Sequence, residues 1–206
     1  MKKAIQLFFI LLLAFAAVNI GKTGLALRSL EHSVIRLHIL ANSDATADQT
    51  RKLLVRDALL TQAASWIPEN ADFETGCAAL QSHLPEIQQT AEQTLRAAGC
   101  GDAVQVSLEQ TAFPARTYGD FTLPEGEYQA LRVEIGAAAG QNWWCVMYPA
   151  MCIPAAAVPA DDVLGDAACD LAENPEEYEV RLKCVELYRA VSKWVTQKIA
   201  ETASNE

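Results

Sequence analysis

The sequence predicts an α+β fold, in which a mostly antiparallel sheet of about four to five strands has two to three helices packed against it. Three observations lead to this class. Short segments that alternate apolar and polar residues, as half-buried strands do, recur along the chain. Long segments with apolar residues at helical spacing lie among them. The 206 residues, less an N-terminal leader, predict a single domain at residues 28–206, long enough to bury a core.

An N-terminal apolar segment precedes the predicted domain. Lys2 and Lys3 are followed by residues 5–20, which carry no charge, and the Gly-Leu-Ala sequence at residues 24–26 resembles a small-x-small cleavage site. We therefore expect residues 1–26 to be a secretory signal peptide. The alternative is an uncleaved membrane anchor, for which the apolar run is short. Either way, the domain that follows is expected to be exported.

The first strand is predicted at residues 34–40, where β-branched and apolar residues alternate with polar ones. Arg36 and His38 should lie on the face opposite the apolar residues. A turn at residues 42–44 follows. Ser43 or Asp44 is expected to cap the next helix by accepting its free N–H groups.

Two helices are expected next. The first should run from about residue 46 to residue 66, with Asp48 in its first turn and within reach of Lys52 four residues on. The second should run from about residue 74 to residue 98. Pro85 is predicted to kink or split it, and Gly99 is predicted to end it.

Two further strands are predicted at residues 104–108 and 128–135, from their alternating patterns. The residues between them, 111–127, are rich in Gly and Pro. They predict a long connection, whose aromatic residues indicate an ordered loop folded over the sheet. A turn at residues 136–140 is then expected to join the strand at 128–135 to the next strand in a hairpin.

The strand after this turn contains the adjacent Trp143 and Trp144, which bury a large apolar area and are expected in the middle of the core. Cys145 and Cys152 flank Pro149, which should end the strand because proline cannot donate to a ladder. In an exported protein these two cysteines are candidates for a disulfide, and two buried free thiols are the alternative. No pairing is predicted for the remaining cysteines, Cys77, Cys100, Cys169 and Cys184.

The C-terminal part begins with residues 155–175, which are rich in Ala, Asp, Glu and Pro and are expected to be the loosest part of the domain. A short strand is predicted at residues 180–184. A helix from about residue 185 to residue 200 should follow and bury an apolar face formed by Leu187, Val191, Trp194 and Val195.

Charge and motifs exclude several classes of function. The net charge of −10 and the lack of a basic stripe argue against nucleic-acid binding and disfavour adsorption to anionic lipid. No catalytic, phosphate-binding or metal-binding motif is present, so we expect no enzymatic activity, cofactor or metal. The rival interpretation is an exported hydrolase that uses His38, Asp44 or Cys145. A structural envelope protein, held by an uncleaved N-terminus, is a third interpretation.

A polar cluster near the first helix is the other candidate site. Its members are Arg36, Asn42, Asp44, Arg56 and Asp57. They could form a structural network that fixes the strand-to-helix corner, or a patch that recognises a partner.

The chain resembles the stage II sporulation protein R family over roughly residues 33–152. The resemblance begins with Val-Ile-Arg-Leu-His-Ile-Leu-Ala-Asn-Ser-Asp at residues 34–44. It continues in short motifs at residues 118–136, such as Gly-Glu-Tyr at 126–128. It is most specific in Gly-Gln-Asn-Trp-Trp-Cys-Val at residues 140–146, followed by Tyr-Pro at 148–149 and Cys152.

The resemblance implies a secreted signalling protein of sporulation that is not itself an enzyme. Such a protein is exported from the forespore into the space between the forespore and mother-cell membranes. There it activates a membrane-embedded aspartic protease, which processes pro-sigma-E in the mother cell. Membrane contact would then be made only through an uncleaved N-terminal segment. The candidate partner-binding residues are Arg36, Asn42, Asp44, Tyr118 and Asp120.

Overall fold

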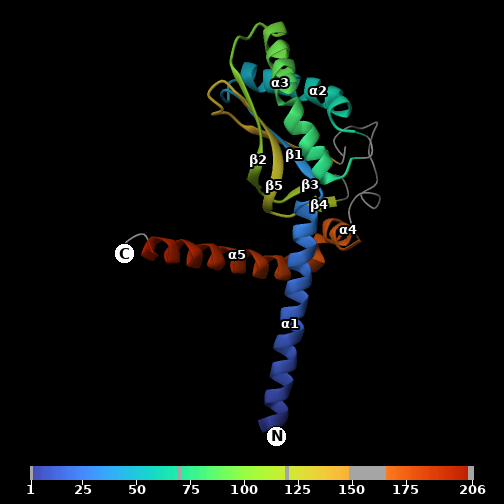
Figure 1. Ribbon diagram of the computed structural model, residues 1–206, viewed down its shortest axis with the longest axis vertical. Coiled ribbons are helices and arrows are strands. Elements are labelled where there is room, and N and C mark those ends of the chain that lie inside the picture. The colour runs from blue at the N-terminus through green and yellow to red at the C-terminus, as the bar shows by residue number, and fades with distance from the viewer. Residues whose placement is uncertain (1, 69–70, 119–120, 149–165, 204–206) are drawn as a thin grey trace. The chain divides into compact units, whose positions relative to one another are not determined.

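The computed structural model describes residues 2–68, 71–118, 121–148 and 166–203 (Figure 1). They divide into two compact units. The sheet unit comprises Glu31–Pro114 and Glu125–Leu164, and the helical unit comprises Met1–Leu30, Ala115–Pro124 and Gly165–Glu206.

The sheet unit is built on four strands in the order β2 (Val104–Phe113), β5 (Gly126–Ile135), β1 (Ile35–Leu40) and β6 (Asn142–Tyr148). β2 pairs antiparallel with β5, and β6 pairs antiparallel with β1. The central pair, β1 and β5, is parallel. The predicted α+β class with a mostly antiparallel sheet is therefore confirmed.

The predicted hairpin between β5 and β6 is wrong. The turn at residues 136–141 does connect these strands in sequence, but β1 lies between them in the sheet and pairs with both. The turn therefore crosses over the end of β1 instead of joining neighbours. Local alternation locates each strand, but it carries no information about a third strand inserted from far upstream.

Two helices cover one face of this sheet, as Figure 1 shows. α2 spans Thr46–Trp66, the predicted range, and α3 spans Phe73–Ala97. Their apolar residues form one core with alternate strand residues from β1 and β5. The fully buried members of this core include Val55, Leu59, Leu80, Ile87, Leu37, Ile39, Leu131 and Val133.

Helix α3 continues through Pro85, so the helix is not split there, and the kink stays a prediction. Proline removes one backbone donor, but Leu80 and Ile87 are fully buried on either side and anchor both halves of the helix. Gly99 ends the helix as predicted, with φ +69. The amide of Cys100 donates to Leu95 O (2.9 Å) and the amide of Gly99 to Arg96 O (3.0 Å), which is the Schellman arrangement.

The long loop predicted at residues 111–127 is mostly strand. β2 continues to Phe113, and a small hairpin of β3 (Arg116–Tyr118) and β4 (Phe121–Leu123) fills most of the remainder. The prolines at residues 114 and 124 mark the points where one pairing ends and the next begins. The prolines and glycines that predicted one long loop therefore separate consecutive strands.

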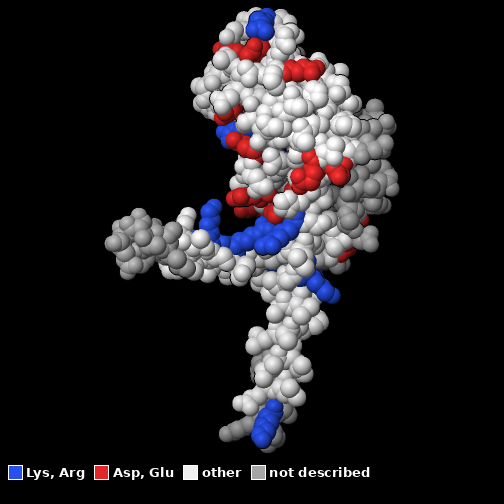
Figure 2. Space-filling model, viewed as in Figure 1, with Lys and Arg blue, Asp and Glu red and all other residues white. Residues whose placement is uncertain are grey.

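The helical unit contains α1 (Lys2–Glu31), α4 (Asp166–Glu173) and α5 (Pro175–Ala203). Residues 6–31 of α1 are long and apolar enough to cross a membrane, a test that an N-terminal signal sequence also passes. Figure 2 shows a stretch of this helix without charged side chains after its basic beginning.

The C-terminal predictions need correction. Residues 180–184 belong to α5 and not to a strand, because Leu182 and Val185 form the buried side of a helix. The apolar residues expected to be buried by this helix, Leu187, Val191, Trp194 and Val195, are exposed. Of the segment expected to be loose, residues 166–173 form α4, and residues 155–165 lie outside the described residues.

Candidate functional site

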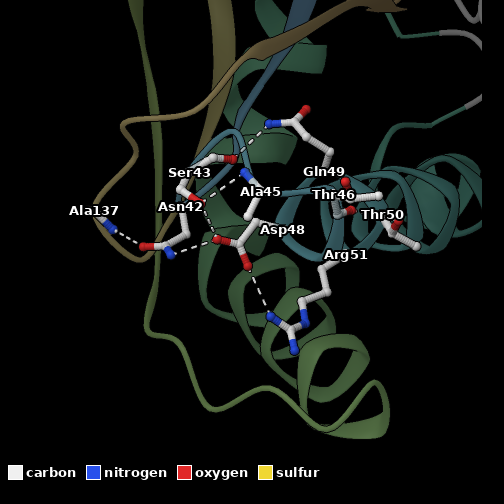
Figure 3. Close-up of polar contacts among 9 residues, drawn as sticks. All are labelled: Asn42, Ser43, Ala45, Thr46, Asp48, Gln49, Thr50, Arg51 and Ala137. Atoms are coloured by element: carbon white, nitrogen blue, oxygen red, sulfur yellow. Dashed lines mark hydrogen bonds and ion pairs between the residues drawn. The ribbon is translucent and has the colours of Figure 1, made fainter.

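The Asp48 carboxylate lies at the centre of the corner between β1 and α2 (Figure 3). Its Oδ2 accepts hydrogen bonds from Asn42 Nδ2 (2.8 Å) and Ser43 Oγ (2.7 Å). Its Oδ1 accepts from Arg51 Nη1 at 3.0 Å. Hydrogen bonds from Ser43 and Asn42, and then the contact with Arg51, lower the pKa of Asp48 below its usual value.

This geometry corrects two predictions. Neither Ser43 nor Asp44 caps α2: the N-cap is Ala45, without a side-chain hydrogen bond, and Ser43 Oγ accepts from the Ala45 amide (3.2 Å) instead. Asp48 does not pair with Lys52. Its carboxylate turns back toward the corner, where three donors converge on it, which leaves Lys52 for other partners.

The corner also binds the turn at residues 136–141. Asn42 Oδ1 accepts from the Ala137 amide (2.9 Å), and Asp44 Oδ1 accepts from the Gln141 amide (2.7 Å). Lys52 Nζ reaches the same turn and donates to Gln141 O at 2.8 Å. The corner (residues 41–52) and the turn together are called the clasp below. It ties the crossover between β5 and β6 to the end of β1.

Two glycines make this close approach feasible. Gly136 has φ +58, and a Cβ there would lie 2.3 Å from Asn42 Oδ1. A Cβ on Gly140 would lie 2.3 Å from the backbone oxygen of Ser43. Both positions therefore require glycine, the first for conformation and space and the second for space alone.

Arg36 is wholly buried on the sheet face opposite α2 and α3. Its guanidinium carbon lies 4.0 Å from the ring centre of Phe113 and 5.0 Å from that of Tyr128. Cation–π contacts of this kind stabilise a desolvated guanidinium. Arg36 thus serves the interior of the fold, and we correct its candidate role as an exposed partner contact.

His38 lies beside this cluster and is 7% exposed. Its ring contacts Phe113 and Trp144, and its Nε2 is 2.9 Å from Asn142 Oδ1. Burial lowers the pKa of His38. The hydrogen bond to Asn142 opposes this effect, Arg132 and Arg36 add to it, and Glu134 opposes it.

His38 and Cys145 cannot act as a catalytic pair in this fold. The register places Cys145 opposite Leu37, and both belong to the core beneath the helices. His38 is opposite Trp144 and faces the other side of the sheet. Among the described residues, no group of three His, Cys, Asp or Glu side chains is arranged to hold a metal ion.

The two tryptophans lie on β6, the edge strand next to β1, and not in the middle of the core. Both are half-buried, and Trp143 packs against the core from the side. The guanidinium of Arg56 covers the Trp143 ring at 4.3 Å and is also paired with Asp57 (2.6 Å). Arg56 and Asp57 thus shield the edge of the core without entering it.

The remaining candidates are not brought to the clasp by any described contact. Tyr118 is half-buried at the end of β3, opposite Phe121 in the small hairpin of the helical unit. Asp120 and Cys152 lie outside the described residues, so the predicted disulfide of Cys145 stays a prediction. Asn42 and Asp44 were recognised from the sequence, whereas the central Asp48 and the contribution of Gln141 were missed.

Comparison with known proteins gives a consistent result. A sequence model of the stage II sporulation protein R family matches residues 31–157, which include the whole clasp. Stage II sporulation protein R of Bacillus subtilis (strain 168) is 36% identical over 160 residues, covering 74% of this chain and 71% of the relative. No solved structure matches the chain.

Proposed function

Because the chain belongs to the stage II sporulation protein R family, we propose that it is an exported signal of sporulation that activates a membrane-embedded aspartic protease. The protease then processes pro-sigma-E in the mother cell. Family membership is the observation that carries this assignment. The chain would leave the forespore and act in the space between the forespore and mother-cell membranes.

In this function the chain works by binding and not by catalysis. An activator must bind the active state of the protease more tightly than the inactive state, which requires a surface of fixed shape. The clasp provides such a surface, because side chains of the corner bond directly to backbone groups of the turn. The separation of His38 from Cys145 disfavours the rival hydrolase.

The contact surface is assigned to the exposed side of the clasp. Asp44, Gln141 and Asn142 are exposed there, next to the half-buried tryptophans of β6. Asn42 holds this surface from beneath through the Ala137 amide. Tyr118 and Asp120 remain candidate contacts.

A disulfide between Cys145 and Cys152 is part of the same assignment. Cys145 is buried on the edge strand, and its predicted partner lies seven residues on. Closing so short a loop contributes roughly 2–3 kcal/mol in the chain-entropy model. Peptide mapping of the exported protein without reduction should recover the two cysteines in one linked species.

The assignment is tested by co-expressing the chain, the protease and the sigma precursor in a host that does not sporulate. Precursor cleavage should depend on the chain. The variant Asp44→Asn keeps an oxygen for the Gln141 amide and removes the charge, so the clasp should stay folded. We expect cleavage to fall about tenfold, the effect of losing ~1.4 kcal/mol of binding.

Asp57→Asn is the matched control, since Asp57 is an exposed aspartate of α2 that pairs with Arg56 outside the clasp. This variant should support normal cleavage. Equal cleavage of the precursor with and without the chain would contradict the function. Equal activity of Asp44→Asn and the wild type would remove the clasp as the contact surface and leave the function standing.

A further inference from the structure

Helix α5 carries an apolar stripe that is exposed to solvent. Leu187, Tyr188, Val191, Trp194 and Val195 are between 40% and 69% exposed. Because each helical residue turns the chain by about 100°, these five positions fall on one face. Leu182 and Val185, which are buried, lie on the opposite face. The stripe is therefore a second apolar surface, separate from the one that packs within the unit.

The charge of this segment is opposite to that of the chain. The protein as a whole carries −10, yet residues 187–197 contain Arg189 and Lys193 and no Asp or Glu. Tyr188 and Trp194 have apolar rings with a polar end, which suits the boundary between lipid and water. Basic residues on one side and aromatic and aliphatic residues on the other are typical of helices that lie on membranes.

The position of the helix in its unit agrees with this composition. Val185 Cγ2 lies 3.8 Å from the point that a Cβ would occupy on Gly24 of α1. The uncharged stretch of α1 ends before Lys22. If α1 is retained as an anchor, α5 therefore passes, at Val185, beside the place where α1 leaves the bilayer.

We propose that α5 docks through this stripe on the headgroup region of an anionic lipid bilayer. A coiled coil with a second copy is disfavoured, since the stripe covers only residues 187–195, and a stable coiled coil needs three to four heptads. A bilayer sets no such requirement. The docking is independent of the proposed protease activation. It would hold the helical unit against a membrane surface.

The test uses the full chain reconstituted through α1 into vesicles of phosphatidylcholine with or without phosphatidylglycerol. Brominated acyl chains quench tryptophans that enter the bilayer. Subtracting the signal of Trp194→Phe isolates Trp194 from the other three tryptophans. We expect at least a twofold loss of Trp194 fluorescence in the anionic vesicles, and a smaller loss in neutral vesicles or at high salt.

The double variant Leu187→Asp/Val191→Asp should abolish this quenching, and Lys193→Glu should remove its dependence on phosphatidylglycerol. Leu54→Asp is the control, because it places the same charge on another exposed apolar residue, in α2. Circular dichroism in detergent verifies that each variant is folded. If only the double variant unfolds, Lys193→Glu still decides the outcome.

Two results would overturn the docking. Trp194 that is open to aqueous acrylamide and insensitive to brominated lipid would show that the stripe stays in water. Trp194 that is shielded from acrylamide without lipid quenching, together with a dimer that the double variant dissociates, would assign the stripe to a second copy.

Discussion

The Asp48 carboxylate accepts hydrogen bonds from Asn42 and Ser43, which precede it in the sequence, and from Arg51, which follows it. Asp48→Asn replaces a carboxylate oxygen by a donor that faces these donors. We expect this variant to be less stable than the wild type in urea unfolding at pH 7. Because the folded pKa is lowered, the advantage of the wild type exists above the unfolded pKa and shrinks as pH falls through the folded one.

Measurements at pH 7 and pH 3 in mild detergent check this prediction. The difference between Asp48→Asn and the wild type should be smaller at pH 3. Asp57→Asn serves as the control, since its carboxylate is exposed and, among the described residues, pairs with Arg56. If the difference in the free energy of unfolding between Asp48→Asn and the wild type does not change with pH, the charge of Asp48 does not stabilise the corner.

His38 gives a second prediction at the scale of one residue. Burial lowers its pKa, so the folded state resists protonation more than the unfolded state does. The free energy of unfolding should therefore be highest, as far as His38 is concerned, above about pH 6.5, the pKa of histidine in the unfolded chain. It should fall as the pH drops below this value. The slope can reach about 1.4 kcal/mol per pH unit for one proton.

Urea unfolding of the wild type between pH 8 and pH 5 measures this slope, and His38→Gln should reduce it. His83→Gln is the control, because, in the described part of the chain, the His83 ring has its hydrogen-bond contacts within its own helix, with Ala79 O and Ser82. A wild-type slope that survives in His38→Gln would place the titrating group elsewhere.

At the scale of elements, the clasp depends on the close approach of the turn to the corner. A methyl group on Gly140 would meet the Ser43 backbone oxygen at 2.3 Å, and backbone cannot move aside as a side chain can. We expect Gly140→Ala to lower the free energy of unfolding by about 1–3 kcal/mol, the usual cost of overpacking.

Gly101→Ala is the matched control, since nothing lies within 4 Å of its Cβ position. Urea unfolding should find this variant as stable as the wild type or slightly more so. Equal stability of the two alanine variants would show that the turn can move away from the corner at no cost.

The same elements show what local patterns predict. Alternation and helical spacing located β1, α2, α3 and β5, because each has one apolar side that faces a core. The insertion of β1 between β5 and β6 was missed, since strand order depends on contacts between residues about 100 positions apart. Residues 180–184 were misread because three alternating positions fit a strand and a helix equally well.

The candidate site was predicted to a similar extent. Asn42 and Asp44 followed from their place after a strand, and they do join the corner. Their partners were missed because these are backbone amides of a distant turn, and an amide has no sequence signature. The sequence favours a surface position for Arg36 because arginine is rarely buried. The aromatic rings that make its burial stable come from β2 and β5.

At the scale of the whole molecule, the chain combines a sheet unit that bears the clasp with a helical unit that bears two apolar helical surfaces, on α1 and α5. The interpretation of residues 28–206 as a single exported domain stays a prediction. The two surfaces differ in kind. α1 is apolar over a length that can cross a membrane, whereas the α5 stripe occupies one face of a helix and suits a membrane surface.

The fate of α1 gives the last prediction. Ala26 and Leu27 flank the expected cleavage point and are buried in the folded chain. A peptidase needs an extended, accessible segment, so cleavage must precede the folding of this region. We expect mass spectrometry of the exported protein to find Leu27 at its N-terminus. Ala26→Trp should keep residues 1–26 attached, because the small residue before the cleavage point is lost.

A wild-type product that retains its N-terminus would establish α1 as an anchor and favour the envelope-bound alternative. The two membrane contacts are then separable by experiment. A cleaved product that still binds anionic vesicles must do so without α1, and Leu187→Asp/Val191→Asp should release it. If the cleaved wild type does not bind such vesicles, α1 is the segment that attaches the uncleaved chain to the membrane. The cleaved signal would then act on its partner from solution.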